Sequence, residues 1–582
     1  MPYLVNGQLV TNDRIRAEEA RISNHPQWRD IGDETARAKR IRVQGELSAI
    51  DAMLVGQIPA GDPGPAEPEL VEHQVRMQKA MGSGVGTHDD RQMRAWAERT
   101  PACSAAPNEV TARAAKPTQT AADMKDHSTT RCSRIRRQRQ PSRVMLLAAL
   151  ALLIPHASVA QAPTYETLYS FKGSPDGGDP KAGVVIGKNG ALYGTTYGGG
   201  ASVLGTVFEL TKPAGEPWKE GVLYNFNGSD GQYPESALVL GSTTGALYGV
   251  TVGGGCGGCT GVVFELAPPS AAGGTWTETV LHAFSGSSEN AAPNGPLLIG
   301  PGGTLYATTQ GSGGPTGTAA ALLPPATLGA PWTESVLYTF GGSPGGGWPF
   351  AGVVSEGGSL LGTTLYGGDE FCGAFGCGVV YELTPPTTPS GAAWTEATLH
   401  TFTGPPSDGA EPQAALAVGP GGALYGTTYY GGPGVCATSG GIEFGCGTVF
   451  QLTPPTVSSG TWAYAVIYNF TGADGDGALP VAGVVVGKNG AIYGTTSSAG
   501  SATPACPASY YVVAGCGIVF ELTPPSSPGG AWTETVLHAF TGENGEGALP
   551  LAGLALSSSG VLYGTTSAGG AAGRGTVFAI EP

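Results

Sequence analysis

The chain has 582 residues, with 96 glycines, 46 prolines, 13% charged residues and a formal net charge of −16. A single hydrophobic core stops growing at roughly 250–300 residues, so this length requires several domains or a repeat array. The acidic balance argues against a nucleic-acid partner, because phosphate binding needs a basic surface.

The composition changes sharply along the chain. Residues 1–144 hold 22 of the 29 basic and 18 of the 45 acidic residues, a net of +4, whereas the remaining 438 residues carry −20. In residues 1–80, VNGQLV at Val5–Val10 precedes an Arg/Glu-rich helical stretch at Ile15–Ile22. This segment resembles the opening of SurA-like parvulin prolyl isomerases, which implies a helical remnant without a catalytic module. We expect residues 81–133 to be a low-order linker.

Residues 134–160 have the pattern of a signal peptide. An arginine cluster, Arg134 to Arg143, precedes the apolar run Val144–Ile154, and Ser158 and Ala160 place small residues before a cleavage point. Eleven helical residues rise only about 16 Å, whereas a bilayer core measures about 30 Å. We therefore predict cleavage after Ala160, a translation start at Met124, no transmembrane span after cleavage, and a secreted or periplasmic protein.

From residue 161 to 582 one unit recurs seven times. Its marker is a strand such as VLYNF, followed by a connecting loop, an AGVV-like strand, an LYGTT strand, a Gly-rich loop and a GTVFELTP strand. In the third unit the last of these strands has decayed to Ala319, Ala320 and Ala321. The marker ends at the following positions: Phe171, Phe226, Phe284, Phe340, Phe402, Phe470 and Phe540.

Each unit therefore predicts four short strands in about 60 residues, and a 3.6-residue apolar period is absent. Four-stranded sheets that pack face to face around an axis form a propeller. The last unit stops after its third strand, at Phe578, and PTYETLYSF at the start of the array supplies the missing fourth. We expect an all-β, seven-bladed propeller closed by this strand, because closure leaves no unpaired edge at the seam.

The recurring LYGTT, GTVFELTP and LY(S/N/T)F strands resemble the GloVer-type tandem repeat of bacterial exported proteins. The resemblance covers residues 164–582. It implies an extracytoplasmic repeat protein, often with a surface-sorting tail, and no established activity.

Eight of the ten cysteines lie in pairs within single loops between the LYGTT and VFEL strands. Even pairing in an exported chain predicts local disulfides. Zinc binding by the CGGC motif and a redox CxxC are the alternatives, but zinc usually takes four ligands and a redox CxxC opens a helix. The pairs are Cys256/Cys259, Cys372/Cys377, Cys436/Cys446 and Cys506/Cys516.

The repeats offer few candidates for catalysis. Their three histidines share one repeat position, which carries tyrosine in the other units, so we expect packing or rim surface rather than a general base. No P-loop or dinucleotide motif is present. We predict no catalytic residue and no cofactor. The residues at this position are His282, His400 and His538, and Tyr169, Tyr224, Tyr338 and Tyr468.

Acidic residues recur in the connecting loops, on the face where the cysteine loops should also lie. They are either solvated turn residues or ligands of Ca²⁺, an ion that prefers carboxylate oxygens. A titration with Ca²⁺ distinguishes the two interpretations. The candidate metal ligands are Asp176, Asp230, Asp408, Asp476 and Glu546.

Two functions remain open. One is a non-enzymatic binding module for a protein or glycan, acting through variable, disulfide-braced loops. The other is a glycan hydrolase or lyase that uses paired carboxylates such as Asp474 and Asp476. Loop aromatics fit glycan binding and loop packing equally: Trp348, Tyr429, Tyr430, Tyr510 and Tyr511.

Overall fold

The structure is a computed structural model that divides into two compact units, Met1–His156 and Ala157–Pro582. It describes residues 3–5, 8–10 and 162–582, with gaps at 272, 286–290, 312–315, 328, 369–371, 373–374, 388–392, 440–441, 458–459, 508–512 and 528. The predicted linker and signal peptide, and the helical pattern of residues 1–80, lie outside the described residues. Near the N-terminus, β1 (Tyr3–Val5) and β2 (Gln8–Val10) form a hairpin.

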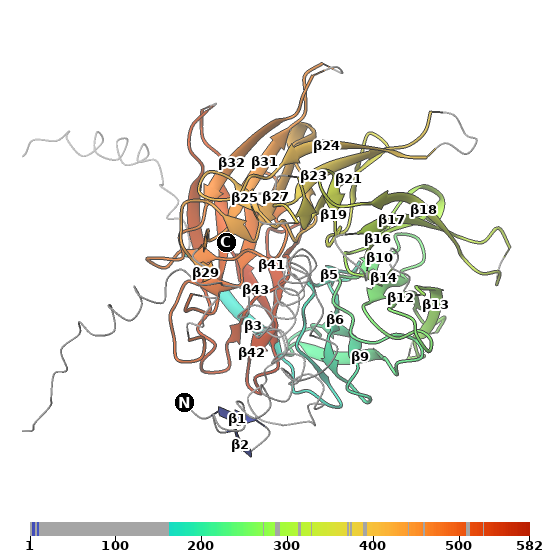
Figure 1. The fold of residues 1–582 in the computed structure, drawn as a ribbon. Coiled ribbons are helices and arrows are strands. Elements are labelled where there is room, and N and C mark those ends of the chain that lie inside the picture. The colour runs from blue at the N-terminus through green and yellow to red at the C-terminus, as the bar shows by residue number, and fades with distance from the viewer. Residues whose placement is uncertain are drawn as a thin grey trace, which may run out of the picture. The chain divides into compact units, whose positions relative to one another are not determined.

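Residues 162–582 form a seven-bladed β-propeller of antiparallel sheets (Figure 1). This confirms the fold predicted from the repeats. In blades one to six the chain runs from an innermost first strand to a fourth strand on the outside, and in blade seven the fourth strand comes from the start of the array. Segments just before the first strands touch their counterparts in neighbouring blades, since a Cβ on Gly183 would lie 2.4 Å from the Gly553 oxygen and one on Gly483 2.6 Å from the Ala415 oxygen.

The strands of blades one to seven follow in order. The first strands are β5 (Val185–Ile186), β10 (Val239–Leu240), β15 (Leu298–Ile299), β20 (Val354–Glu356), β26 (Ala417–Val418), β34 (Val485–Val486) and β40 (Ala555–Leu556). The second are β6 (Leu192–Thr196), β11 (Leu247–Thr251), β16 (Leu305–Gln310), β21 (Ser359–Thr364), β27 (Leu424–Thr428), β35 (Ile492–Thr496) and β41 (Leu562–Thr566).

The third strands are β8 (Thr206–Thr211), β12 (Val262–Ala267), β17 (Gly317–Leu323), β23 (Val379–Thr384), β31 (Thr448–Thr453), β37 (Ile518–Thr523) and β43 (Thr576–Glu581). The fourth are β9 (Lys219–Asn225), β13 (Thr277–Ala283), β18 (Thr333–Phe340), β24 (Thr395–Thr401), β32 (Ala463–Asn469), β38 (Thr533–Ala539) and β3 (Thr164–Ser170). In blade three, β14 (Ala291–Pro293) also pairs with β16.

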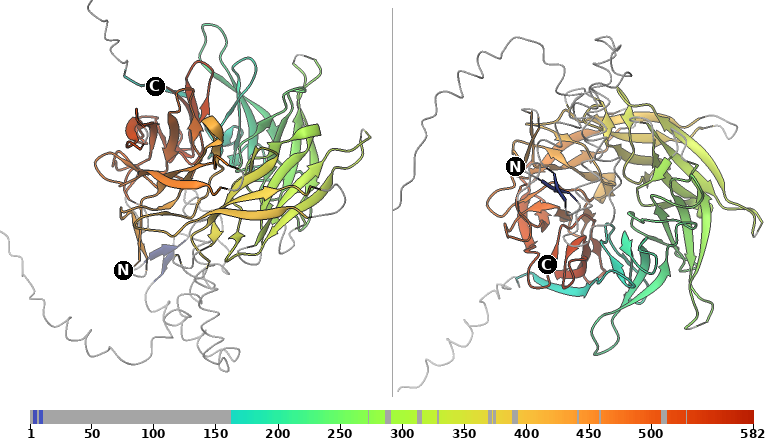
Figure 2. Two further views of the ribbon diagram at one scale, coloured as in Figure 1. Left: turned by 90° about the horizontal axis from the view of Figure 1, so that it is seen from above. Right: turned by 60° about the horizontal axis from the view of Figure 1, so that its bottom comes forward.

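The first strand of the array closes the ring. β3 pairs with β43 from Thr164 opposite Glu581 to Ser170 opposite Thr576, so the cyan and red ends of the propeller share one sheet (Figures 1 and 2). Of the described residues, none forms a helix of a length and apolarity that would span a bilayer.

Aromatic rings join one blade to the next. The phenylalanine that ends each fourth strand is fully buried, and six of the seven meet an aromatic ring on the third strand of the following blade. The centroids lie 4.8–5.2 Å apart in edge-on or tilted geometry, which contributes about 0.5–1.5 kcal/mol per pair beyond the area buried. The pairs are Phe171–Phe208, Phe226–Phe264, Phe340–Tyr381, Phe402–Phe450, Phe470–Phe520 and Phe540–Phe578.

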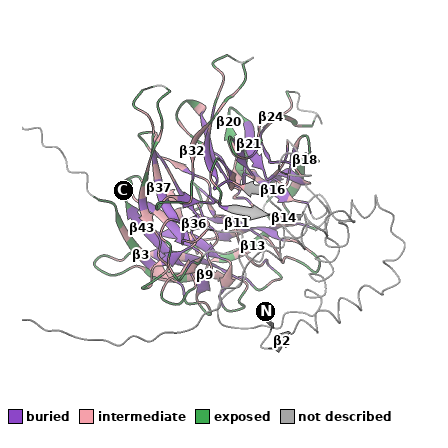
Figure 3. Cartoon of the chain, turned by 60° about the vertical axis from the view of Figure 1, so that its left-hand side comes forward, coloured by how far each residue is buried: buried purple, intermediate pink, exposed green. Residues whose placement is uncertain are grey.

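A second series of contacts between blades uses the first threonine of LYGTT. Its hydroxyl donates to a carbonyl just before the first strand of the next blade, with Oγ1–O distances of 2.8–3.4 Å. Thr565 makes this bond to Ala182 across the seam between blades seven and one. Val250 occupies the position in blade two and has no hydroxyl. Purple, buried strands accordingly fill the interior of the ring (Figure 3).

The decayed third unit keeps its strand. Ala319, Ala320 and Ala321 are buried in β17, which pairs with both neighbours in the blade. The alanine side chains remove the aromatic partner of Phe284 and the glutamate that accepts from the LYGTT tyrosine in other blades, but the backbone ladder does not depend on the side chain.

Tyr381 offers a test of this packing. Its hydroxyl is buried and makes no hydrogen bond, while the equivalent ring in the other paired blades is phenylalanine. Tyr381→Phe should raise the free energy of unfolding by about 1–3 kcal/mol, because it removes an unpaired polar atom from the core. Guanidinium denaturation measures this change. Phe450→Tyr is the reciprocal control and should destabilise, whereas a loss of stability in Tyr381→Phe would contradict the assignment.

Candidate functional site

The connecting loops and the cysteine loops share one face of the propeller, here called the loop face. Two-residue strands from the two loops pair with each other in five blades, which places both loops at the same end of the sheet. The pairs are β4 (Gly177–Gly178) with β7 (Gly198–Gly199), β19 (Gly346–Gly347) with β22 (Tyr366–Gly367), β25 (Gly409–Ala410) with β28 (Tyr430–Gly431), β33 (Gly477–Ala478) with β36 (Ser498–Ala499), and β39 (Gly547–Ala548) with β42 (Ala568–Gly569).

Seven equivalent residues on the loop face, one in each connecting loop, adopt positive φ angles, between 41° and 57°. Each precedes a proline and leads into the first strand of its blade. Positive φ is uncommon for residues with a side chain, and a following proline disfavours it further. These residues, called the central ring below, are Asp179, Tyr233, Ala292, Trp348, Glu411, Leu479 and Leu549.

Backbone hydrogen bonds hold the ring in this conformation. The N–H of Glu411 donates to the Cys377 carbonyl of the preceding blade at 2.8 Å, and its own carbonyl accepts from Tyr429 at 3.2 Å. Leu479 and Leu549 make the same two bonds, with Cys446 and Cys516 as the acceptors of their N–H groups. The strained backbone at these three positions is therefore held by the preceding blade as well as by its own blade.

The proline that follows each ring residue packs on a glycine that begins the third strand of the preceding blade. A Cβ on Gly447, for example, would lie 2.4 Å from Cδ of Pro480, and one on Gly517 would lie 2.8 Å from Cδ of Pro550. This close approach explains the glycine of the GTVFELTP motif and the proline of the connecting loop together.

The disulfides brace the same loops. Each joins two cysteines within one loop, with Cα–Cα distances of 4.9–5.3 Å: Cys256–Cys259, Cys372–Cys377, Cys436–Cys446 and Cys506–Cys516. The pairing is the one that the sequence predicted. Three of these bonds include the cysteine whose carbonyl holds a ring residue, so they stiffen the ring directly. Disulfides of this kind persist in oxidising compartments, outside the cytoplasm.

Glu411 stands out chemically in the ring. It is half-buried, and among the described residues no hydrogen bond reaches its carboxyl group. Burial raises the pKa of Glu411 to about 7. Burial, and to a lesser extent the charge of Glu411, raises the pKa values of Tyr366, Tyr429 and Tyr430 around it. A half-buried carboxyl group that no protein donor reaches can accept a hydrogen bond from a ligand.

The second acid of the ring, Asp179, is paired with a base, since it lies 3.5 Å from Arg574. Two residues after Asp179, and outside the ring, Lys181 forms an ion pair with Glu235 of the next blade at 2.7 Å. The ammonium group of Lys181 also lies 3.6 Å from the Tyr197 ring centroid. Charge on this side of the face is therefore largely neutralised.

Three of the predicted loop aromatics belong to this site. Trp348 is a ring residue and its ring lies 5.2 Å from Tyr366, while Tyr429 and Tyr430 meet edge-on at 4.5 Å. Tyr510 and Tyr511 lie outside the described residues.

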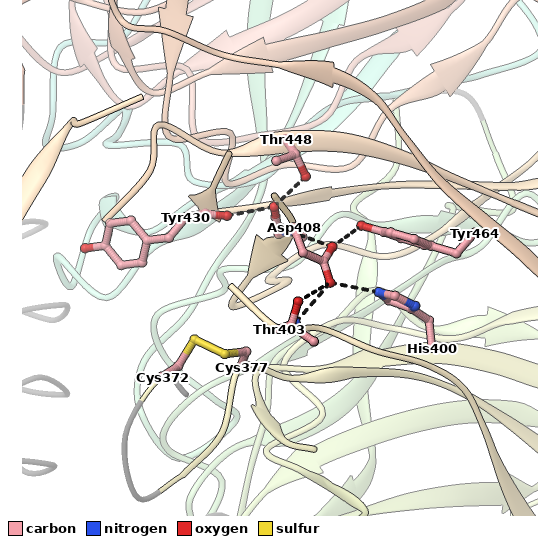
Figure 4. Close-up of polar contacts among 10 residues, drawn as sticks. Cys372, Cys377, His400, Thr403, Asp408, Tyr430, Thr448 and Tyr464 are labelled. Carbon is pink, nitrogen blue, oxygen red and sulfur yellow. Dashed lines mark hydrogen bonds and ion pairs between the residues drawn. A yellow bond between two sulfur atoms is a disulfide. The ribbon is translucent and has the colours of Figure 1, made fainter. Parts of the chain in front are cut away.

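The acidic residues that the sequence offers as candidate metal ligands hydrogen-bond to protein groups in and around the connecting loops. Around Asp408, His400 Nε2 lies 3.2 Å from Oδ2, Tyr464 donates to Oδ1 at 2.5 Å, and the Thr403 backbone donates at 2.9 Å (Figure 4). Burial would raise the pKa of Asp408, but the hydrogen bonds from His400 and Tyr464 lower it below the usual value. The carboxylate is therefore satisfied by protein groups.

The equivalent acids repeat this arrangement. Asp176 accepts from Tyr169 at 2.9 Å, Asp230 from Tyr224 at 2.6 Å, and Glu546 lies 2.5 Å from His538. Asp476 accepts from the backbone and side chain of Thr471. Within the described ranges no three His, Cys, Asp or Glu side chains gather as a metal site.

This arrangement explains why histidine and tyrosine interchange on the fourth strand. Both can place a hydrogen-bond donor on the acid of the following connecting loop, as Tyr169 and His400 do. His282 lies 3.4 Å from Glu334, an acid of the next blade.

The Gloeobacter/Verrucomicrobia repeat matches residues 158–375, 326–506 and 434–582, which together span the whole propeller. The chain belongs to this repeat family. The resemblance of residues 1–80 to SurA-like isomerases is not supported, and no curated protein matches the chain.

Solved structures with similar folds are propellers of low similarity. A putative 6-phosphogluconolactonase from Bacteroides uniformis is 13% identical, with a TM-score of 0.38 over 62% of this chain and 86% of the other. A gluconolactonase from Xanthomonas campestris is 12% identical (TM-score 0.31, 72% and 89%), and a mutant of AofleA from Arthrobotrys oligospora is 12% identical (0.33, 66% and 91%). We infer no activity from them.

The sequence did not point to a set of glutamates at the contact between outer strands. Glu220, Glu278 and Glu534 occupy the second position of β9, β13 and β38, and each has a buried Oε1 that makes no hydrogen bond. Burial, and then the charge of the nearby connecting-loop aspartate, raise the pKa of each to about 7. In the sequence, these glutamates are marked only by a WTE-like triplet, a pattern that is typical of an exposed turn.

Because of these glutamates, we expect the free energy of unfolding to fall as the pH rises. A carboxyl group with a raised folded-state pKa holds its proton when the unfolded chain has lost it, so stability is lost between about pH 4.5 and 7. Glu534→Gln should therefore raise the melting temperature at pH 8 and leave it nearly unchanged at pH 4.5. Glu396→Gln, at the equivalent position beside Tyr338, is the matched control because its connecting loop, 341–350, carries no acid. An equal shift at both pH values would contradict the prediction.

Proposed function

We propose that this protein is an exported, non-enzymatic binding module that holds a segment of a partner protein over its central ring. One observation carries the proposal. Seven equivalent positions share one strained backbone conformation while their side chains differ in chemistry. Strained backbone persists only where the surrounding structure enforces it and is typical of ligand-binding positions.

The chemistry of the ring favours a protein segment with apolar and basic side chains. Leu549 and Leu551 in blade seven, Val481 in blade six, and Trp348 and Phe350 in blade four are partly exposed apolar side chains. Beside them Glu411 supplies the one ring carboxyl that lacks a hydrogen-bond donor among the described residues. Apolar anchors around a single acid suit a peptide that inserts apolar side chains and one lysine or arginine.

Rigidity supports the same function. The cysteine loops vary in length between blades, yet four of them are closed by disulfides and three hold ring residues by a cysteine carbonyl. A preorganised surface loses less conformational entropy when it binds a ligand.

The test is a binding screen of the full chain on a display library of 15-residue peptides and on a glycan array. We expect saturable binding to peptides rich in apolar and basic residues. Trp348→Ala and Glu411→Gln should each weaken it about tenfold, because each removes an anchor from the ring. Lys488→Ala on the opposite face is the control and should leave the affinity unchanged.

Three outcomes would overturn the proposal: no saturable binding in either screen, binding that the ring variants leave unchanged, or hydrolysis of a glycan in a zymogram of the full chain. Binding confined to the glycan array, with the same sensitivity to the ring variants, would replace the partner protein by a glycan. Circular dichroism confirms that each variant is folded.

A further inference from the structure

On the face opposite the loop face, here called the turn face, a cleft opens between blades one and two. The turn face carries the turns between first and second strands and between third and fourth strands. The cleft has a volume of about 440 Å³, within the range of small-ligand pockets. Blade one contributes Lys188, Tyr193, Glu209 and Lys212, and blade two contributes Trp276.

A short turn opens this cleft. The turn between β8 and β9 covers residues 212–218, seven residues, whereas the equivalent turn of blade two covers residues 268–276, nine residues. In blades three, five and six it also has nine residues, and in blade four it has ten. Residues 211–213, at the start of this shorter turn, line the cleft together with Tyr193.

The aromatic wall of the cleft is formed by a tryptophan and a tyrosine, and this pair recurs in other blades. A tryptophan precedes the fourth strand in blades one to six and packs near the LYGTT tyrosine of the preceding blade where that tyrosine is present. Here the centroids of Trp276 and Tyr193 lie 6.0 Å apart, edge to face, and both side chains are half-buried. The apolar body of each ring is thus available to a ligand beside its polar end.

The polar wall is particular to this cleft. Residues 145–582 contain only seven basic side chains against 27 acidic ones, and two of the seven, Lys188 and Lys212, line this one pocket. Lys212 stands where five other blades have proline: Pro268, Pro324, Pro385, Pro454 and Pro524. On such an acidic chain, two cations at one cleft favour an anionic ligand.

Contacts with neighbouring groups hold the polar side chains of the cleft in place. Tyr193 donates its hydroxyl to Oε1 of Glu209 at 2.8 Å, which leaves the second carboxylate oxygen to accept from a ligand hydroxyl. Lys188 Nζ donates to the Ser242 carbonyl of blade two at 3.1 Å, so the lysine is held at the blade boundary. Lys212 Nζ lies 5.6 Å from the Trp218 ring centroid.

We infer that the cleft between blades one and two binds a carboxylated sugar, a uronate or a short uronate chain. The sugar ring stacks on Trp276, a hydroxyl donates to Glu209, and the carboxylate accepts charge-assisted hydrogen bonds from Lys188 and Lys212. The inference concerns a different face from the proposed peptide site and does not depend on it.

The chain supplies a matched control in blade six. Lys488 donates to the Ser558 carbonyl at 3.1 Å, and Tyr493 donates to Glu521 at 3.4 Å, as their counterparts do in blade one. In the facing blade seven, however, Pro163 stands where the tryptophan should be, and Pro524 replaces the second lysine. Lys488 therefore has the same local contacts without the rest of the site.

Isothermal titration calorimetry on the full chain tests the inference, with galacturonate, glucuronate and mannuronate trisaccharides and a neutral galactose trisaccharide as probes. We expect saturable binding of at least one uronate, about tenfold weaker binding of the neutral sugar, and about tenfold losses in Lys188→Ala and in Lys212→Ala. Lys488→Ala should bind as the parent does. Trp276→Leu should also lose binding.

No saturable heat with any uronate at millimolar concentration would overturn the inference, as would equal affinity for the neutral sugar or an equal loss in Lys488→Ala. Trp276 packs between blades, so a thermal melt must show that Trp276→Leu is folded. The two lysines are exposed, and their variants decide the question even if the tryptophan variant does not fold.

Discussion

The contact between neighbouring blades is the interaction on which the rest of this structure depends. An isolated four-stranded sheet exposes both faces, so each blade is stable only against its neighbours. Buried aromatic pairs such as Phe540–Phe578 and threonine–carbonyl bonds such as Thr565 to Ala182 repeat this contact around the ring. Because β3 brings Phe171 to the last blade, the same contact crosses the seam and the ring has no open edge.

Blade packing also creates the surfaces to which we assign binding. Backbone hydrogen bonds to two blades hold the positive φ angles of the ring, as at Glu411, whose N–H bonds to one blade and whose carbonyl bonds to another. The cleft on the turn face lies between blades one and two, beside the short turn of blade one and Trp276 of blade two. Variation between repeats in loop length and side chains thus produces distinct sites on one shared framework.

The acidic loop residues show where reasoning from the sequence ended. Their recurrence was visible, and so was the exchange of histidine for tyrosine on the fourth strand, and the two positions lie only six to eight residues apart along the chain. The turn after the fourth strand brings them together, as at Asp408 with His400, whereas only the packing of blades adds Tyr464 from the next blade. Carboxylates satisfied in this way anchor loops, and the prediction of bound Ca²⁺ receives no support from their geometry.

The sequence by itself determined the seven repeats, the four strands of each, the closing role of Thr164–Ser170 and the disulfide pairing, because all of these follow from periodicity and from short separations along the chain. Only the tertiary structure decided which residues meet between blades. The unpaired glutamates at positions 220, 278 and 534, the strained ring and the cleft at Trp276 each join residues of neighbouring blades. Such pairs leave no local pattern, since their spacing is set by the rotation from one blade to the next.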